Sequence, residues 1–238
     1  MSADSAALLA AAERSAHATA ARDKAGWVGL FTDDGRVEDP VGSRPHVGHG
    51  EIERFYDTFI GPRQITFHRD VDIVEKTSVI RDVTLEAQMS ADLRLMIPAF
   101  IRYDLRESES DWQIERLRAY WELPAMVAQF LGSGAKSLPA ALRLSAALMR
   151  NQRLGGTAGF LSGFRSPARR GKRIVEQALA DGRLGDARNT AWHKVIGAGD
   201  TVVASVTAPE GRGVVFANVD GPVIRNVEYF AASATDRA

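Results

Sequence analysis

The chain of 238 residues contains no cysteine. It therefore cannot form a disulfide, use a thiolate as a nucleophile or bind zinc through sulfur. An excess of charge of one sign is missing too, because 30 lysine and arginine residues balance 30 aspartate and glutamate residues. The overall charge thus gives no reason to expect an acidic partner, and we expect no binding to nucleic acid.

Long apolar runs are also missing. The alanine-rich beginning of the chain has no basic start and is interrupted by Glu13, Arg14, Arg22 and Asp23. We therefore expect neither a signal peptide nor a membrane span there, and we expect a cytoplasmic protein. The spacing of the histidines and carboxylates fits no metal site, and the glycines do not form a phosphate loop, so we expect neither a metal nor a cofactor.

Helical patterns come first along the chain, and strand patterns follow. The sequence predicts helices over residues 4–21, over 26–31 with an end near Asp33–Gly35, and around the apolar residues of 52–59. Alternating apolar residues predict strands over 66–74, 78–85, 93–103 and 113–121. This order favours an α+β fold in which a curved antiparallel sheet wraps around the N-terminal helices and leaves a pocket between them.

Asp39 stands directly before Pro40 in the chain. Proline disfavours the helical conformation for the residue before it, so Asp39 is expected in an extended segment or a turn. If apolar side chains surround this carboxylate, its pKa rises and it can act as a general base. The alternative is an ordinary Asp-Pro turn, in which the carboxylate bonds to its own backbone.

The run Leu30–Pro40 resembles the helix end and first strand of ketosteroid isomerases. These enzymes belong to the larger family that includes nuclear transport factor 2 and the SnoaL-type cyclases. Phe55-Tyr56 and Ala119-Tyr120-Trp121 fall where later pocket residues of that family fall. The resemblance covers roughly the first half of the chain. It implies the cone-shaped fold called NTF2-like, chemistry without a cofactor, and an apolar, steroid-like substrate.

The resemblance also implies roles for single residues. Asp39 matches the base that moves a proton across one face of a 3-oxo-Δ5 steroid. The two groups that hydrogen-bond the oxyanion are not matched, since they fall on Ser15 and near Ile101. Tyr103 shares the strand parity of Ile101 and is the predicted substitute donor, whereas Asp104 has the opposite parity and should face out. The expected catalytic residues are Asp39 and Tyr103, and the expected substrate-binding residues are Phe31, Phe55, Tyr56, Leu117 and Trp121.

The second half of the chain repeats features of the first half. Gly156–Leu161 is similar to Gly26–Phe31, and Phe164–Pro167 corresponds to Val37–Pro40 with Ser166 in the place of Asp39. The later correspondences are those of Gly171–Val175 with Gly50–Arg54, Thr201–Thr207 with Ser78–Thr84, and Asn226–Phe230 with Arg118–Trp121. The interpretation is an internal duplication, and the alternative is a chance similarity between two α+β units.

The duplication predicts two tandem NTF2-like cones, over residues 1–130 and 131–238, with the second copy shortened. The glycine- and serine-rich segment 131–137 is the expected linker. The two copies should pack sheet against sheet, as an intrachain pseudo-dimer or as part of a homodimer. Because Ser166 replaces the carboxylate, only the first copy should keep a deep pocket.

Between Glu122 and Glu176 every charged residue is basic. Such a stretch can bind phosphates or an anionic membrane surface. Arg143 and Arg150 lie among leucines, however, so we favour the solvated edge of an amphipathic helix. Contact with a membrane surface is therefore not expected. Acids of the first copy are expected to face this stretch across a domain interface, namely Glu51, Glu53 and Asp57.

Two functions remain open at this point. The first is a cofactor-free isomerase, or a related lyase or cyclase, that acts on a 3-oxo steroid or a similar apolar ketone through Asp39. The second is a binding module that holds a hydrophobic ligand or a protein partner without chemistry. An intact Asp39 favours the first function, and the unmatched oxyanion donors favour the second.

Overall fold

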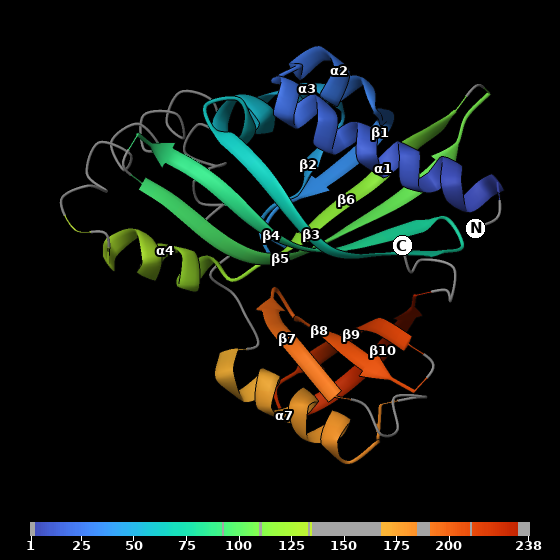
Figure 1. Cartoon of the computed structure of the whole chain (residues 1–238), viewed down its shortest axis with the longest axis vertical. Coiled ribbons are helices and arrows are strands. Elements are labelled where there is room, and N and C mark those ends of the chain that lie inside the picture. Colours follow the sequence, from blue (N-terminus) through green and yellow to red (C-terminus); the bar gives the residue numbers. More distant parts are fainter. Residues whose placement is uncertain are drawn as a thin grey trace.

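The computed structural model describes residues 3–91, 93–109, 111–132, 134, 168–184, 191–209 and 211–232. Two sheets lie face to face at its centre, and helices cover the outer face of each (Figure 1). The helices are α1 (Ala3–Ala21), α2 (Lys24–Gly29), α3 (His49–Phe55) with the π-helical turn η1 (Tyr56–Ile60), α4 (Leu123–Gly132) and α7 (Ala168–Ala180). The first sheet contains β1 (Phe31–Glu38), β2 (His46–Val47), β3 (Gln64–Glu75), β4 (Ser78–Ser90), β5 (Leu93–Glu107) and β6 (Trp112–Tyr120). The second sheet contains β7 (Ala191–Ala198), β8 (Thr201–Ala208), β9 (Gly211–Asp220) and β10 (Val223–Ala231).

The N-terminal unit is a curved sheet that partly encloses α1, α2 and α3 (Figure 1). Its strand order is β2-β1-β6-β5-β4-β3, and β1 pairs with β6 in parallel while the other neighbours are antiparallel. Alternate residues of β5, such as Ile101 and Tyr103, point to the helices and join the core around Trp27. Period-two alternation therefore decides which side chains meet the helices. This α+β unit fits the predicted NTF2-like cone.

The second helix ends earlier than predicted. It stops at Gly29, and Phe31 already begins strand β1. Phe31 and Val37 are fully buried, and Val37 lies opposite Leu117 in the parallel pairing with β6. Because these long-range contacts bury both residues in an extended segment, they override the local helical pattern near Gly35.

The two sheets bury a shared apolar layer. From the first sheet, Ile73, Ile80 and Phe100 project away from the helices into this layer. The second sheet contributes Val203, Val214, Phe216 and Phe230, among others. The other face of the second sheet packs against α7 through Val175 and its neighbours. Sheet-to-sheet packing therefore stabilises both units, since each sheet would otherwise expose one apolar face.

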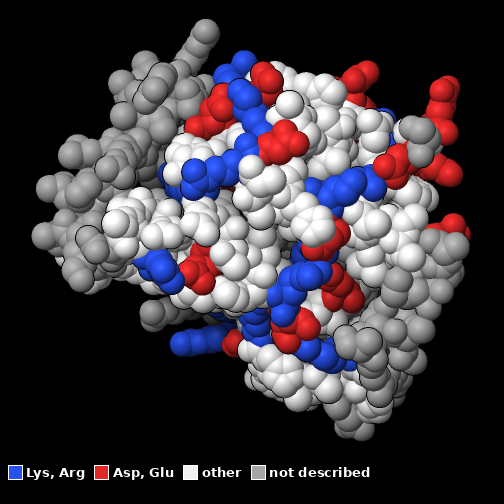
Figure 2. Space-filling model, turned by 45° about the horizontal axis from the view of Figure 1, so that its top comes forward, with Lys and Arg blue, Asp and Glu red and all other residues white. Residues whose placement is uncertain are grey.

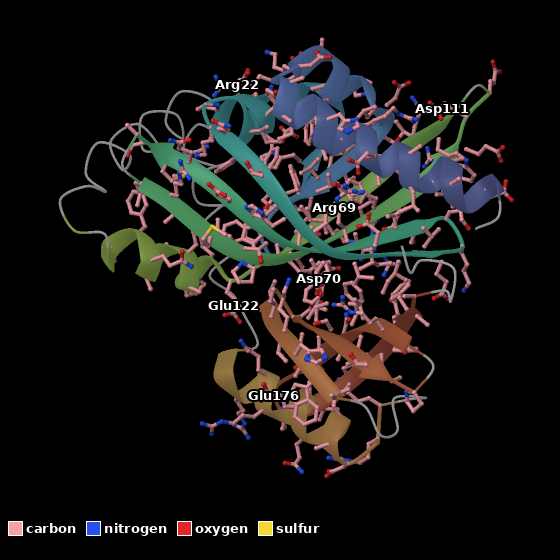
Figure 3. All side chains as sticks on the ribbon, in the orientation of Figure 1. Arg22, Arg69, Asp70, Asp111, Glu122 and Glu176 are labelled. Atoms are coloured by element: carbon pink, nitrogen blue, oxygen red, sulfur yellow. The ribbon has the colours of Figure 1, made fainter. Side chains whose placement is uncertain are left out.

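Charged pairs cross the same interface. They join Asp82 to Lys194, Asp70 to Arg212, Arg102 to Glu228, and Glu122 to Lys172. Asp70 and Glu122 lie on the side of the first sheet that faces the second sheet (Figure 3). The Lys194 ammonium group also donates to the carbonyl oxygen of Val83 at 2.8 Å and lies 5.0 Å from the centre of the Phe100 ring. The interface thus combines a shared apolar layer with charged pairs, and the Asp82 carboxylate is fully buried in it.

The acids that face the basic stretch differ from those predicted. Lys172, on α7, pairs with Glu122 at 2.7 Å. Glu51 instead pairs with Arg54 on its own helix, and Asp57 with Lys24. The physical reason is that α3 covers the helix-side face of the first sheet, away from the second sheet (Figure 1). Arg143 and Arg150 lie outside the described residues.

Parts of the predicted repeat can be compared with the structure. Gly171–Val175 lies in α7, Thr201–Thr207 in β8 and Asn226–Phe230 in β10. The segment 156–167, with Ser166, lies outside the described residues, as does most of the predicted linker, whose first two residues end α4. Within the described ranges, no helix is both long and apolar enough to cross a membrane. On the face drawn in Figure 2, basic side chains lie beside acidic ones.

Candidate functional site

An apolar hollow opens at one end of the N-terminal cone, between α3 with η1, the sheet, and α4. Its empty space, open mouth included, is about 670 Å³. We call it the Asp39 hollow. The residues that line it are Asp39, Phe55, Phe59, Arg63, Ile65, Leu85, Ala87, Met89, Ile97, Trp121 and Met126.

The Asp39 carboxylate lies in the wall of this hollow, directly after the end of β1. The indole Nε1 of Trp121 donates a hydrogen bond to its Oδ1 at 2.5 Å. Burial raises the pKa of Asp39 to about 6, and the Trp121 hydrogen bond lowers it in part. Asp39 is therefore a base that is ionised at neutral pH but still able to take up a proton.

Replacing Trp121 by phenylalanine is expected to raise the pKa of Asp39 above about 6. The indole donor stabilises the charged carboxylate, and phenylalanine keeps an aromatic wall without that donor. The measurement is an NMR titration of the Asp39 carboxyl carbon in both proteins. As a control, Trp112→Phe changes a tryptophan that does not line the hollow and should leave the titration unchanged. An equal or lower pKa in Trp121→Phe would refute this account of the site.

Arg63 is the cationic residue in the wall of the Asp39 hollow. It follows η1, and its Nη1 donates to the carbonyl oxygens of Thr58 and Phe59, both at 2.8 Å. Burial lowers the pKa of Arg63 to about 10, so its guanidinium stays charged at neutral pH. The hollow thus combines a carboxylate, a guanidinium and an indole N–H with apolar walls.

The predicted site residues separate into two groups. Asp39, Phe55 and Trp121 come together at the hollow. Phe31, Tyr56 and Leu117 are buried in the helix-side core instead, where the rings of Trp27 and Phe31 lie 4.9 Å apart and those of Trp27 and Tyr56 5.5 Å apart. The structure therefore places these three among the residues that support the site and not in its lining.

Tyr103 lies in a polar cluster away from Asp39. Its hydroxyl interacts with Ser15, which also accepts a 3.1 Å hydrogen bond from Trp27. Burial raises the pKa of Tyr103, and the Arg81 guanidinium counteracts this effect. Arg81 in turn is bound by Asp72 and Glu13. The predicted parity is confirmed, since Tyr103 faces the helices, but the structure does not bring Tyr103 together with Asp39.

Asp104 faces the other side of the sheet, as its parity predicted. Its carboxylate accepts hydrogen bonds from Ser78, Arg102 and Arg118, at 2.8, 2.8 and 2.6 Å. The two arginines hold the pKa of Asp104 below its usual value despite its burial. Asp104 thus contributes to the polar side of the sheet interface and not to the hollow.

Most of the lining was not singled out by sequence reasoning. Leu85, Ala87 and Met89 share one face of β4, and their alternation could have identified that face. Met126 comes from α4, beyond the segment that carried the resemblance. Arg63 gives no comparable pattern in the sequence. In the described part of the chain, histidines and acids form no group of three that could bind a metal ion.

Comparison with known proteins finds similarity in the N-terminal unit. The family model described as the SnoaL-like domain matches residues 12–108. A ketosteroid isomerase from Mycobacterium sp. is 26% identical with a TM-score of 0.45, over 50% of this chain and 95% of that one. A Mycobacterium tuberculosis protein in complex with estradiol-17β-hemisuccinate is 22% identical with a TM-score of 0.45, over 49% and 94%. An M. tuberculosis epoxide hydrolase described as LEH-like is 16% identical with a TM-score of 0.46, over 58% and 97%.

Proposed function

We propose that this chain, whose residues 12–108 form a SnoaL-like domain, is a cofactor-free isomerase that moves a C=C bond in an apolar, steroid-sized ketone. The observation that carries the proposal is the Asp39 carboxylate, which Trp121 holds at the wall of an apolar hollow and whose pKa is raised to about 6. A base is most effective when its pKa lies near the working pH. Asp39 meets this requirement.

Proton transfer by Asp39 accounts for the whole reaction. The ionised carboxylate removes a proton from the carbon between the carbonyl group and the C=C bond, and the electron pair of that C–H bond forms a dienolate. The protonated Asp39 then returns the proton to the far end of the dienolate, which leaves the C=C bond conjugated with the carbonyl group. The apolar walls exclude water, which would otherwise exchange with this proton. Protons and electrons balance without a co-reactant.

The test is the conversion of 5-androstene-3,17-dione to its conjugated isomer, followed by the new ultraviolet band. We expect kcat/KM to be constant above pH 7 and to fall about tenfold per pH unit below about 6, because protonated Asp39 cannot act as a base. A related lyase or cyclase would use the same base but would not form this band. A rate that stays constant down to pH 4 would exclude Asp39 as the base.

A binding module is the second candidate, and the position of Tyr103 favours it. Tyr103 interacts with Ser15 and Arg81, and the indole N–H of Trp121 is already bonded to Asp39. Among the described residues no tyrosine lines the hollow, and the loss of one oxyanion donor typically costs two to three orders of magnitude in rate. Steroid binding without formation of the conjugated product would support this candidate.

The C-terminal unit is, in our proposal, a shortened second NTF2-like copy over residues 131–238, paired with the first copy over 1–130. Two observations support it. Helix α7 precedes the meander β7–β10 as α3 precedes β3–β6. The α7 side of the second sheet is filled by apolar side chains, including Leu179, Val202 and Val215. The second copy would then act as a scaffold for the sheet that carries the ligand site.

A further inference from the structure

Arg63 lines an apolar hollow but has no acidic partner there. Its two hydrogen bonds to the protein go to the carbonyl oxygens of Thr58 and Phe59, and both come from one nitrogen, Nη1. Among the described residues, no carboxylate lies within ion-pair distance of its guanidinium. The donors on Nε and Nη2 are therefore available to a ligand.

Two other arginines with little exposure in the described part of the chain are paired with acids. Arg81, whose side chain is 1% exposed, is bound by Asp72 and Glu13, and Arg102 is bound by Asp104 and Glu228. A buried charge is costly unless an opposite charge or several hydrogen bonds compensate it. Arg63 is thus a partly buried cation whose compensation is incomplete until an anion binds.

The position of Arg63 defines which part of a ligand it would meet. Arg63 also lines a groove of mixed polarity between α1 and β3, whose polar residues include Arg22, Gln64 and Arg69. Figure 3 places Arg22 and Arg69 on the helix side of the sheet. Arg69 forms an ion pair with Glu13. Arg63 therefore lies where the Asp39 hollow meets this groove.

Asp39 and Arg63 lie in different parts of the wall of the hollow. Burial and the Trp121 hydrogen bond shift the pKa of Asp39, and the guanidinium of Arg63 does not contribute to this shift. Asp39 follows β1, whereas Arg63 follows η1 at the border with the groove. A ligand that reaches both groups would have its reacting carbons at Asp39, an apolar body against the apolar lining, and its other end at Arg63.

We propose that the Asp39 hollow takes an apolar ketone that carries a carboxylate at the end opposite the reacting carbonyl group, and that Arg63 is the residue that selects this acid. This inference rests on the proposed use of the hollow as a ketone site. A guanidinium matches a carboxylate through two parallel N–H donors, and such charge-assisted bonds are stronger than neutral ones. The acid supplies the opposite charge that Arg63 lacks.

The test compares two probes of nearly equal size, 3-oxo-4-pregnene-20-carboxylic acid and its methyl ester. We expect the wild type to bind the acid about tenfold to a hundredfold more tightly than the ester by calorimetry at pH 8. Arg63→Met should reduce the affinity for the acid to that for the ester and leave ester binding unchanged. Arg63→Lys should keep a preference for the acid, because it keeps the charge. Arg116→Met, on the exposed surface of β6, is the matched control and should bind as the wild type does.

Several outcomes would overturn the inference. These are equal binding of both probes by the wild type, binding of neither probe, or an equal loss for both probes in Arg63→Met, which would indicate a purely structural role at the end of η1. If Arg63→Met does not fold, the wild type and Arg63→Lys are compared. A preference for the acid in both supports the inference, and equal binding of acid and ester by either protein overturns it. A wild type that prefers the acid but never converts 5-androstene-3,17-dione would refute the proposed isomerase and leave the role of Arg63 standing.

Discussion

The Asp39→Asn variant is expected to form the conjugated enone from 5-androstene-3,17-dione about 10²–10⁴ times more slowly than the wild type. Asparagine keeps the shape of the side chain and an oxygen that accepts the Trp121 hydrogen bond. It has no basic oxygen, so the proton can no longer be removed and returned. The measurement is kcat/KM at pH 8, where Asp39 of the wild type is ionised.

Measurements of ligand binding and of stability show whether Asp39→Asn has lost only the base or has lost the fold. The variant should bind 4-androstene-3,17-dione at least as tightly as the wild type, since the substitution removes the buried carboxylate charge from the hollow. Burial raises the pKa of Asp39 in the folded protein, so its charge lowers the stability of the wild type as the pH rises through about 6. The variant should therefore be no less stable at pH 8. Asp33→Asn changes an exposed carboxylate of the same strand and should retain full activity. Equal turnover by Asp39→Asn and the wild type would exclude Asp39 as the base.

The Lys194→Met variant is expected to lower the free energy of unfolding by about 3 kcal/mol at pH 8. Asp82 is 0% exposed, and Lys194, at 20% exposure, is its partner from the other sheet. The second carboxylate oxygen of Asp82, Oδ2, has no hydrogen-bond partner among the described residues. Methionine preserves the length and apolar part of the lysine but leaves the Asp82 carboxylate buried without compensation. Urea denaturation of both proteins measures the difference.

The pH dependence and a second substitution test whether the buried Asp82 charge causes the lower free energy of unfolding of Lys194→Met. Burial raises the pKa of Asp82 in the folded protein, so the variant should lose more stability at pH 8 than at pH 5, where Asp82 is more readily protonated. The double variant Lys194→Met/Asp82→Asn should recover more than half of the loss. Arg225→Met is the control, because Arg225 and Asp220 are 63% and 71% exposed and such pairs contribute little. A loss in Lys194→Met as small as that in Arg225→Met would show that the two sheets do not depend on this pair.

Some features of the fold and site follow from local sequence. The spacing of apolar residues predicts the order of helices and strands. Each element buries one face, and backbone geometry fixes the spacing at which residues of that face recur. Pro40 restricts the backbone of Asp39, and period-two alternation assigns Tyr103 and Asp104 to opposite faces of β5. For these reasons the sequence alone determined the α+β class, the non-helical backbone at Asp39 and the opposite faces of Tyr103 and Asp104.

Other features depend on contacts between segments far apart in the chain. Parity assigns Tyr103 to the helix side but does not say where along the cone it lies, and packing against Ser15 and Arg81 decided that. The helical pattern near Gly35 was overridden by the pairing of β1 with β6. The pairing of Asp82 with Lys194 joins residues 112 positions apart. Local patterns specify direction and face, whereas the distance between two side chains is a property of the whole packed chain. Only the tertiary structure, therefore, decided that Asp39 and Arg63 share one hollow.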